Sequence, residues 1–280
     1  MKLPGPLVDA DWLRERLREP GLVVADVRWV PDGTGRAVFA SGHIPGAVYL
    51  DIDEDLAAPA GGAGLGRHPL PSPSHFARTM TLAGIGDDDA VVCYDAARGS
   101  HAARLWWMLA VTGRAAALLD GGLEAWTGPL ERGAARRSPA PFTERLWPAE
   151  AIADAEAVAT AIREGSGPVL DARAPERYRG EVEPIDARAG HIPGARSAPW
   201  TANLDERGRF LPPEELRQWY ESIDVGEGGG AVSYCGSGVT ACADAFAMER
   251  AGLGRPRVYV GSWSEWIGDP ERPIATGPEP

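Results

Sequence analysis

The hexapeptide Gly-His-Ile-Pro-Gly-Ala occupies residues 42–47 and recurs unchanged at residues 190–195. Similar stretches follow each copy, so the chain is a duplication. One pair of equivalent positions differs in chemistry, because Asp95 in the first half corresponds to Cys235 in the second. Each of these two residues precedes a tryptophan by 31 positions. One half has a thiol where the other has a carboxylate, which indicates one working site and one inactive site.

The length of 280 residues leaves room for two hydrophobic cores. Each half alternates short β-branched runs with helical patterns, which predicts an α/β protein with helices flanking a mainly parallel sheet. We expect an N-terminal domain at 1–130, a linker rich in Pro, Arg, Ala and Gly at 131–147, and a C-terminal domain at 148–280. A Gly/Pro-rich loop at 57–73 has no equivalent in the second half.

Helical patterns and buried strands can be located in both halves. The predicted strands are residues 91–94 and 231–234. The predicted helices are residues 9–17, 100–111, 149–163 and 240–251.

Composition excludes several classes of function. The net charge of −12 disfavours a nucleic acid or an anionic membrane surface as a partner. The sequence has neither a signal-peptide pattern nor an apolar run of about 18 residues, so we expect a cytoplasmic protein. Three cysteines without metal-type spacing support neither a disulfide framework nor a zinc site. No metal or organic cofactor is implied.

The loop Cys-Gly-Ser-Gly-Val-Thr-Ala at 235–241 joins a predicted strand to a predicted helix. This is the edge of a parallel sheet at which α/β proteins place ligands. Its glycines allow the backbone N–H groups to turn inward, and the helix N-terminus adds partial positive charge. Both effects favour a thiolate at Cys235, and the thiolate is the nucleophilic form of cysteine. The alternative is an ordinary buried thiol.

The chain resembles the tandem-domain rhodanese family of sulfurtransferases over nearly its full length. The resemblance rests on the paired hexapeptides, on Leu-Asp-Gly-Gly-Leu-Glu-Ala-Trp at 119–126, on Arg-Tyr-Arg-Gly at 177–180 and on Gly-Ser-Trp-Ser-Glu-Trp at 261–266. It implies two rhodanese-like domains, of which the first is catalytically inert and the second carries the working cysteine. It also implies that Cys235 accepts a sulfur atom as a persulfide, held by the backbone amides of its loop.

The loop sequence indicates the sulfur donor. Thiosulfate-using members resemble Cys-Arg-Lys-Gly-Val-Thr, whereas this loop resembles that of members using 3-mercaptopyruvate. The loop residues implied in substrate binding are Gly236, Ser237, Gly238, Val239 and Thr240. Loss of two cations should weaken the binding of a dianion. We therefore expect 3-mercaptopyruvate as donor, with thiosulfate as the alternative, and cyanide or a thiol such as that of a thioredoxin-like protein as acceptor.

The resemblance also implies a catalytic trio in which His68 and Asp53 of the first half join Ser237. The inserted loop lengthens the spacing between Asp53 and His68 to 15 positions, so a surface histidine is the alternative for His68. Arg177 corresponds to an arginine that binds the donor's carboxylate, for which a planar guanidinium is well suited.

A second carboxylate-binding arginine of the family is missing here. Residues 183–186 are Glu-Pro-Ile-Asp, without the arginine that usually follows the proline. Arg179 and Arg188 are the possible substitutes.

Two rival functions use similar loops. A cysteine phosphatase or arsenate reductase needs an arginine near the end of the loop, where this chain has Ala241. A non-catalytic rhodanese-like module usually lacks the cysteine, which Cys235 retains. In the first half, residues 96–100 (Ala-Ala-Arg-Gly-Ser) have no early glycine, so we expect no ring of amides there.

The remaining cysteines and the repeated histidines are expected to be structural. Cys93 lies within a predicted core strand and Cys242 within a predicted buried helix. His43 and His191 occur in both copies of the hexapeptide, including the inert one, so we expect buried side chains that satisfy turns.

Overall fold

The computed structural model describes residues 1–59, 65–226 and 230–280, so residues 60–64 of the predicted loop 57–73 lie outside the described residues. The chain forms two compact units. The first comprises Met1–Ala58 and Leu70–Trp147, and the second comprises Pro59–Pro69 and Pro148–Pro280. Pro59–Pro69 thus belongs with the second unit, although it lies in the first half of the sequence.

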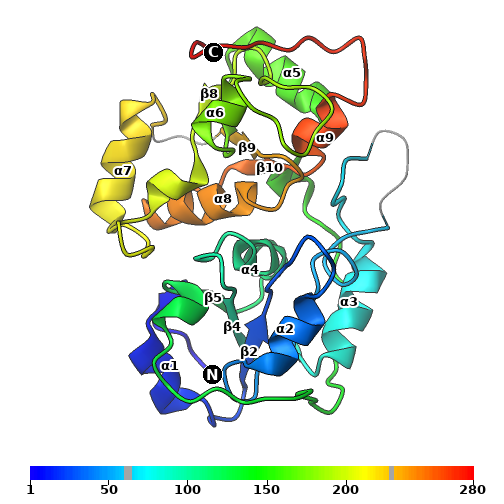
Figure 1. Ribbon diagram of the computed structural model, residues 1–280, viewed down its shortest axis with the longest axis vertical. Coiled ribbons are helices and arrows are strands. Elements are labelled where there is room, and N and C mark those ends of the chain that lie inside the picture. The colour runs from blue at the N-terminus through cyan, green and yellow to red at the C-terminus, as the bar shows by residue number, and fades with distance from the viewer. Residues whose placement is uncertain (60–64, 227–229) are drawn as a thin grey trace. The chain divides into compact units, whose positions relative to one another are not determined.

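The first unit is built on a parallel five-stranded sheet in the order β1-β5-β4-β2-β3 (Figure 1). Its strands are β1 (Leu7–Val8), β2 (Leu22–Asp26), β3 (Val48–Tyr49), β4 (Ala90–Tyr94) and β5 (Ala116–Leu119). Its helices are α1 (Ala10–Arg16), α2 (Gly35–Ser41), α3 (Pro73–Leu82), α4 (Ala102–Val111) and the 3₁₀ helix Gly122–Ala125. Strands β2 and β4 are buried along their whole length, as expected for parallel strands covered on both faces.

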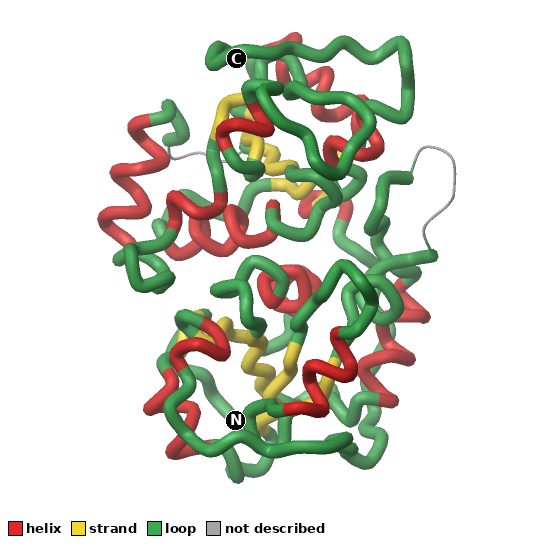
Figure 2. Tube along the Cα trace, viewed as in Figure 1, coloured by secondary structure: helices red, strands yellow, loops and turns green. Residues whose placement is uncertain are grey.

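The second unit repeats this architecture with the sheet order β6-β10-β9-β7-β8. Its strands are β6 (Ile152–Ala153), β7 (Val169–Asp171), β8 (Arg196–Ser197), β9 (Val232–Tyr234) and β10 (Arg257–Tyr259). Its helices are α5 (Ala155–Glu164), α6 (Pro175–Tyr178), α7 (Pro213–Ser222), α8 (Ala241–Arg250) and α9 (Ser262–Trp266), with 3₁₀ helices at Ala149–Ala151 and Trp200–Asn203. Figure 2 shows helices beside the strands of each unit. The predicted α/β class with two parallel sheets is confirmed.

A buried arginine anchors the hexapeptide in each unit. Arg28 follows β2 and donates a hydrogen bond to the Gly42 carbonyl at 2.8 Å, and Arg173 follows β7 and donates to the Gly190 carbonyl at 2.6 Å. Each guanidinium also forms a buried ion pair with the aspartate two residues before it. The attraction and hydrogen bonds within each pair offset the cost of removing both charges from water.

The repeated histidines are buried, as predicted. The His43 Nδ1 atom lies 2.9 Å from the Phe39 carbonyl oxygen, and its ring stacks on Phe39. The His191 Nδ1 atom lies 2.8 Å from the Tyr178 carbonyl oxygen, and its ring stacks on Tyr178. The two histidines therefore close equivalent turns in the two units.

Three of the four predicted helices are confirmed to within two residues at either end. The prediction of one helix over 149–163 is wrong at its start, because residues 152–153 form β6 and pair with β10. The helix α5 begins after Asp154, whose side chain accepts a hydrogen bond from the Ala157 N–H at 2.8 Å. Pairing at the sheet edge and this N-cap outweigh the local helical pattern.

Residues 131–147 run irregularly along the first unit. Trp147 donates its indole N–H to the Pro71 carbonyl at 2.8 Å, and the Thr143 hydroxyl donates to Asp87 at 2.5 Å. Among the described residues, no helix is both long and apolar enough to span a bilayer.

Candidate active site

Cys235 lies directly after β9, in the loop that leads into α8. It is buried, with 2% of its surface exposed. The Gly238 N–H points to its sulfur atom, with N···Sγ at 3.1 Å. The backbone N–H of Cys235 donates to the Ser262 hydroxyl at 3.1 Å. A backbone donor and the N-terminus of a ten-residue helix both favour negative charge on this sulfur.

Gly238 is required by the shape of this loop. Its φ is +76°, in the left-handed region that favours glycine. A Cβ atom added to Gly238 would also collide with the Val260 carbonyl oxygen. The close approach of Gly238 to Val260 therefore sets the loop curvature that aims its N–H at Cys235.

Ser237, the third residue of this loop, contacts His68 within the second unit. The His68 Nδ1 atom lies 2.7 Å from the Ser237 Oγ atom, and Ser237 is 7% exposed. The structure thus brings together two predicted site residues that are 169 positions apart, despite the longer spacing from Asp53. Asp53 lies in the first unit, where its carboxylate accepts a hydrogen bond from the Trp29 indole at 2.8 Å. Its place in the trio remains a prediction.

Arg177, at the end of α6, is held by two carboxylates. Its guanidinium donates to Glu183 at 2.6 and 3.1 Å and to Asp186 at 3.2 Å. Burial alone would raise the pKa of Glu183, but the hydrogen bonds and charge of Arg177, together with the backbone N–H groups of Asp186 and Ile185, lower the pKa on balance. A Cβ atom on Gly236 would lie 3.7 Å from both terminal nitrogens of Arg177. The guanidinium therefore lies over the residue next to Cys235.

Arg67 is a further cation at this loop, and no motif in the sequence indicates it. It forms an ion pair with Asp186, and its Nη2 atom would lie 2.7 Å from a Cβ atom on Gly236. Its backbone N–H donates to the Ser264 hydroxyl at 3.0 Å. Its position beside His68 in sequence was the available signal, but nothing local links Arg67 to a loop 168 positions away.

The two possible substitutes for the missing arginine, Arg179 and Arg188, have different surroundings. Arg179 pairs with Glu181 at 2.7 Å on the surface. Arg188 has a buried Nη1 atom without a hydrogen-bond partner among the described residues, and its carbonyl accepts from the Trp263 indole at 2.9 Å.

In the first unit, the Asp95 carboxylate occupies the position of the cysteine thiol and is fully buried. It accepts four backbone hydrogen bonds of 2.7–2.8 Å from the loop that follows it. The donors are the N–H groups of Ala97, Gly99, His101 and Ala102. The expectation that this loop lacks a ring of amides is therefore wrong.

The reason lies in the backbone conformation of Arg98. Its φ is +59°, so it takes up the left-handed conformation that Gly238 adopts at the equivalent position. An arginine can adopt this conformation at some energetic cost. The first loop thus keeps an anion-binding shape, and its own carboxylate fills it.

Cys93 and Cys242 lie in the core, as predicted. Burial, together with the negative charge of Asp95, raises the pKa of the Cys93 thiol well above its ordinary value. The Cys242 thiol is fully buried and lies 3.5 Å from the Gly238 carbonyl oxygen. Neither environment favours a thiolate.

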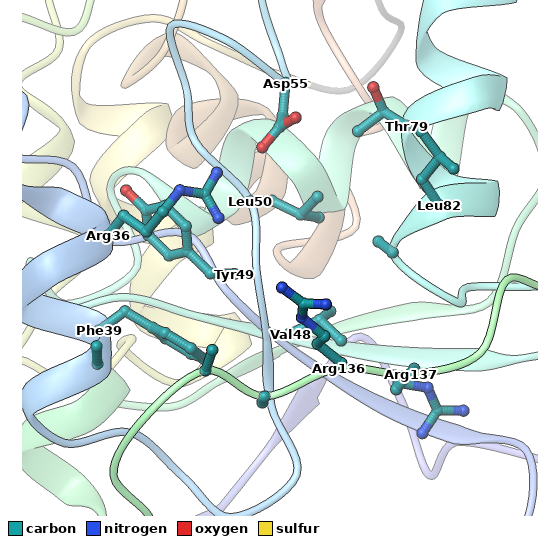
Figure 3. Close-up of a pocket in the computed structure, with 14 residues that line it drawn as sticks. Arg36, Phe39, Val48, Tyr49, Leu50, Asp55, Thr79, Leu82, Arg136 and Arg137 are labelled. Atoms are coloured by element: carbon teal, nitrogen blue, oxygen red, sulfur yellow. The ribbon is translucent and has the colours of Figure 1, made fainter.

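A separate pocket of about 400 Å³ opens on the first unit (Figure 3). Arg36, Arg136 and Arg137 bring positive charge to its wall, and Arg36 stacks over Tyr49 at 5.1 Å. Its described lining residues include none of the predicted site residues.

The two units thus place a buried cysteine and a buried aspartate at equivalent positions, and each side chain accepts backbone N–H groups of the loop that follows it. The Rhodanese-like domain family matches residues 9–129 and 154–269, and the chain belongs to that family.

Known proteins resemble the chain over almost its whole length. "Probable 3-mercaptopyruvate sulfurtransferase" of Pseudomonas aeruginosa is 45% identical over 97% of this chain and 98% of its own. "Thiosulfate/3-mercaptopyruvate sulfurtransferase 1, mitochondrial" of Arabidopsis thaliana is 31% identical over 96% of this chain and 78% of its own. The crystal structure of SseA from Escherichia coli matches with a TM-score of 0.80 and 33% identity, covering 92% of this chain and 99% of SseA.

Proposed function

We propose that this enzyme transfers sulfur from 3-mercaptopyruvate to a thiol or to cyanide through a persulfide on Cys235. The observation that carries the proposal is the loop around Cys235, in which Gly238 directs an N–H to the sulfur and Ser237 contacts His68. The loop supplies a nucleophile that accepts a backbone N–H group and, two residues further on, one member of an acid–base pair. The similarity to the Pseudomonas protein supports the choice of donor.

The first half-reaction breaks the carbon–sulfur bond of the donor. The Cys235 thiolate attacks the donor's sulfur, a sulfur–sulfur bond forms, and the electron pair of the C–S bond leaves with carbon as the enolate of pyruvate. That enolate takes a proton to give pyruvate, while the terminal sulfur of the persulfide can release one. Ser237 and His68 are the groups proposed to carry these protons, with Asp53 orienting the imidazole.

The second half-reaction moves the outer sulfur to an acceptor. An acceptor thiolate or cyanide attacks this sulfur, the sulfur–sulfur bond breaks, and Cys235 leaves as the thiolate with which the cycle began. A thioredoxin-like protein is the proposed thiol acceptor. We also propose a cytoplasmic location, which the three unpaired cysteines support, because free thiols persist in reducing compartments.

Thiosulfate is the second candidate donor, and Arg67 is the observation that favours it. The loop at 235–241 has no cation of its own to bind a dianion, yet Arg67 brings a guanidinium next to Gly236. Steady-state kinetics with both donors and cyanide as acceptor separates the candidates. We expect kcat/KM to be at least about tenfold higher with 3-mercaptopyruvate, a difference of about 1.4 kcal/mol. A higher value with thiosulfate would reject the proposed donor and leave the sulfurtransferase assignment standing.

A further inference from the structure

Two guanidinium groups converge on Gly236, the residue next to Cys235. A Cβ atom at this position would lie 2.7 Å from Arg67 Nη2 and 3.7 Å from Arg177 Nη1. Arg177 lies six residues before Glu183 and nine before Asp186, so its acidic partners are close to it in sequence. Arg67 comes from the other half of the sequence and lies in Pro59–Pro69 of the second unit. The convergence is therefore a product of the tertiary fold.

Acidic side chains hold both groups by other nitrogen atoms. Asp186 accepts from Arg67 Nη1 and from Arg177 Nη2, and Glu183 accepts from Arg177 Nε and Nη2. Arg67 Nη2 and Arg177 Nη1, which approach Gly236, have no hydrogen-bond partner among the described residues. The two carboxylates thus hold both guanidinium groups in place and leave one NH₂ group of each arginine available to a ligand. Two such groups suit the two oxygens of a carboxylate.

Gly236 keeps this space open. A side chain at position 236 would meet the end of Arg67 before anything else. Because Gly236 adjoins Cys235, an anion bound by the two arginines would lie close to the nucleophile.

We propose that Arg67 binds the carboxylate of the sulfur donor together with Arg177, and that Asp186 positions both guanidinium groups. This inference rests on the proposed function, and it adds a specificity-determining residue from the first half of the sequence. The ligand class is an α-keto thiol with a carboxylate, in which the anionic group and the transferable sulfur are carried on the same three-carbon chain.

The test compares 3-mercaptopyruvate with 1-mercaptopropan-2-one, in which a methyl group replaces the carboxylate. For Arg67→Ala, we expect kcat/KM for 3-mercaptopyruvate to fall about tenfold or more, mainly through KM, since a charge-assisted hydrogen bond is lost. The value for the uncharged donor should stay within about twofold. Arg67→Lys should recover only part of the loss, because an ammonium group lacks the planar fork.

Two further variants guard against misfolding and nonspecific effects. Gly236→Ala should displace the Arg67 side chain and lower the preference for the carboxylate in the same direction, with Arg67 itself retained. Arg196→Ala is the matched control, because Arg196 is also partly exposed, lies in the same unit and pairs with Asp224 at 3.1 Å. It should leave both donors unchanged.

The outcomes separate this inference from the proposed function. Equal losses on both donors, or no loss with 3-mercaptopyruvate, would overturn the role of Arg67 while the wild type still preferred 3-mercaptopyruvate to thiosulfate. A wild type that uses 1-mercaptopropan-2-one as well as 3-mercaptopyruvate would overturn the carboxylate site itself. A wild type that prefers thiosulfate to both would reject the proposed donor and the inference together.

Discussion

Replacement of Asp95 by alanine tests the anion-binding loop of the first unit. The carboxylate is fully buried and accepts four backbone N–H groups at 2.7–2.8 Å, so Asp95→Ala leaves two buried and two partly buried donors without their acceptor. A hydrogen bond to a charged group contributes about 1.5–3 kcal/mol. Water entering the vacated space recovers part of this. We therefore expect the first unit to lose about 3–5 kcal/mol of its free energy of unfolding.

Scanning calorimetry measures this loss, because two units can unfold in separate transitions. For a domain of this size, the expected loss lowers the melting temperature of the first unit by about 10–15 °C. Sulfate should bind the emptied ring of amides and restore part of the stability, by about 2.7 kcal/mol at a hundredfold excess over its Kd. The wild type at the same sulfate concentration controls for the general stabilising effect of that salt.

Asp11→Ala is the matched control for the loss of a carboxylate. Asp11 pairs with Arg14 at 2.7 Å on the exposed surface of α1, so its removal should cost less than about 0.5 kcal/mol. An Asp95→Ala protein that melted as the Asp11→Ala protein does, and that gained nothing extra from sulfate, would show that the loop around Asp95 is not an anion-binding site.

Two further predictions concern the loop around Cys235. Gly238→Ala forces a side chain into the Val260 carbonyl at a φ of +76°, so it should cost about 2–3 kcal/mol and prevent persulfide formation. Thermal melting and intact-mass analysis check it, and an active, unshifted variant would contradict it. Ser237→Ala should lower kcat about 10²-fold with little change in KM, because the Ser237–His68 pair is proposed to move protons. Steady-state kinetics checks it, and an unchanged kcat would exclude Ser237 from proton transfer.

Local sequence patterns predicted the parts of the fold that depend on neighbouring residues. The apolar run before Cys235 and the helical pattern after it are local, and both elements form close to their expected positions. Prediction from local patterns fails at residues 149–163, because β6 forms only by pairing with β10. The local hydrophobic pattern contains no information about a partner strand about 100 positions away.

Site residues whose role follows from their own side chain and their motif could be predicted from the sequence. Site residues whose role depends on tertiary contacts could not. The thiol at Cys235 could be inferred from its loop motif, and the partnership of Ser237 with His68 was implied by the resemblance to the rhodanese family. Arg67 could not, because its relation to Gly236 exists only in the folded chain. The ring of amides around Asp95 was missed for a different reason: Arg98 adopts a conformation that sequence reasoning assigns to glycine.

Intact-mass spectrometry after treatment with 3-mercaptopyruvate tests most directly whether Cys235 carries the sulfur. The wild-type protein should gain one sulfur atom, about 32 Da, and lose it on addition of cyanide. Cys235→Ser should gain nothing and melt like the wild type, whereas Cys242→Ser should still gain the sulfur, because Cys242 is a buried helix residue. A mass gain on the folded Cys235→Ser protein would place the nucleophile elsewhere and contradict the mechanism.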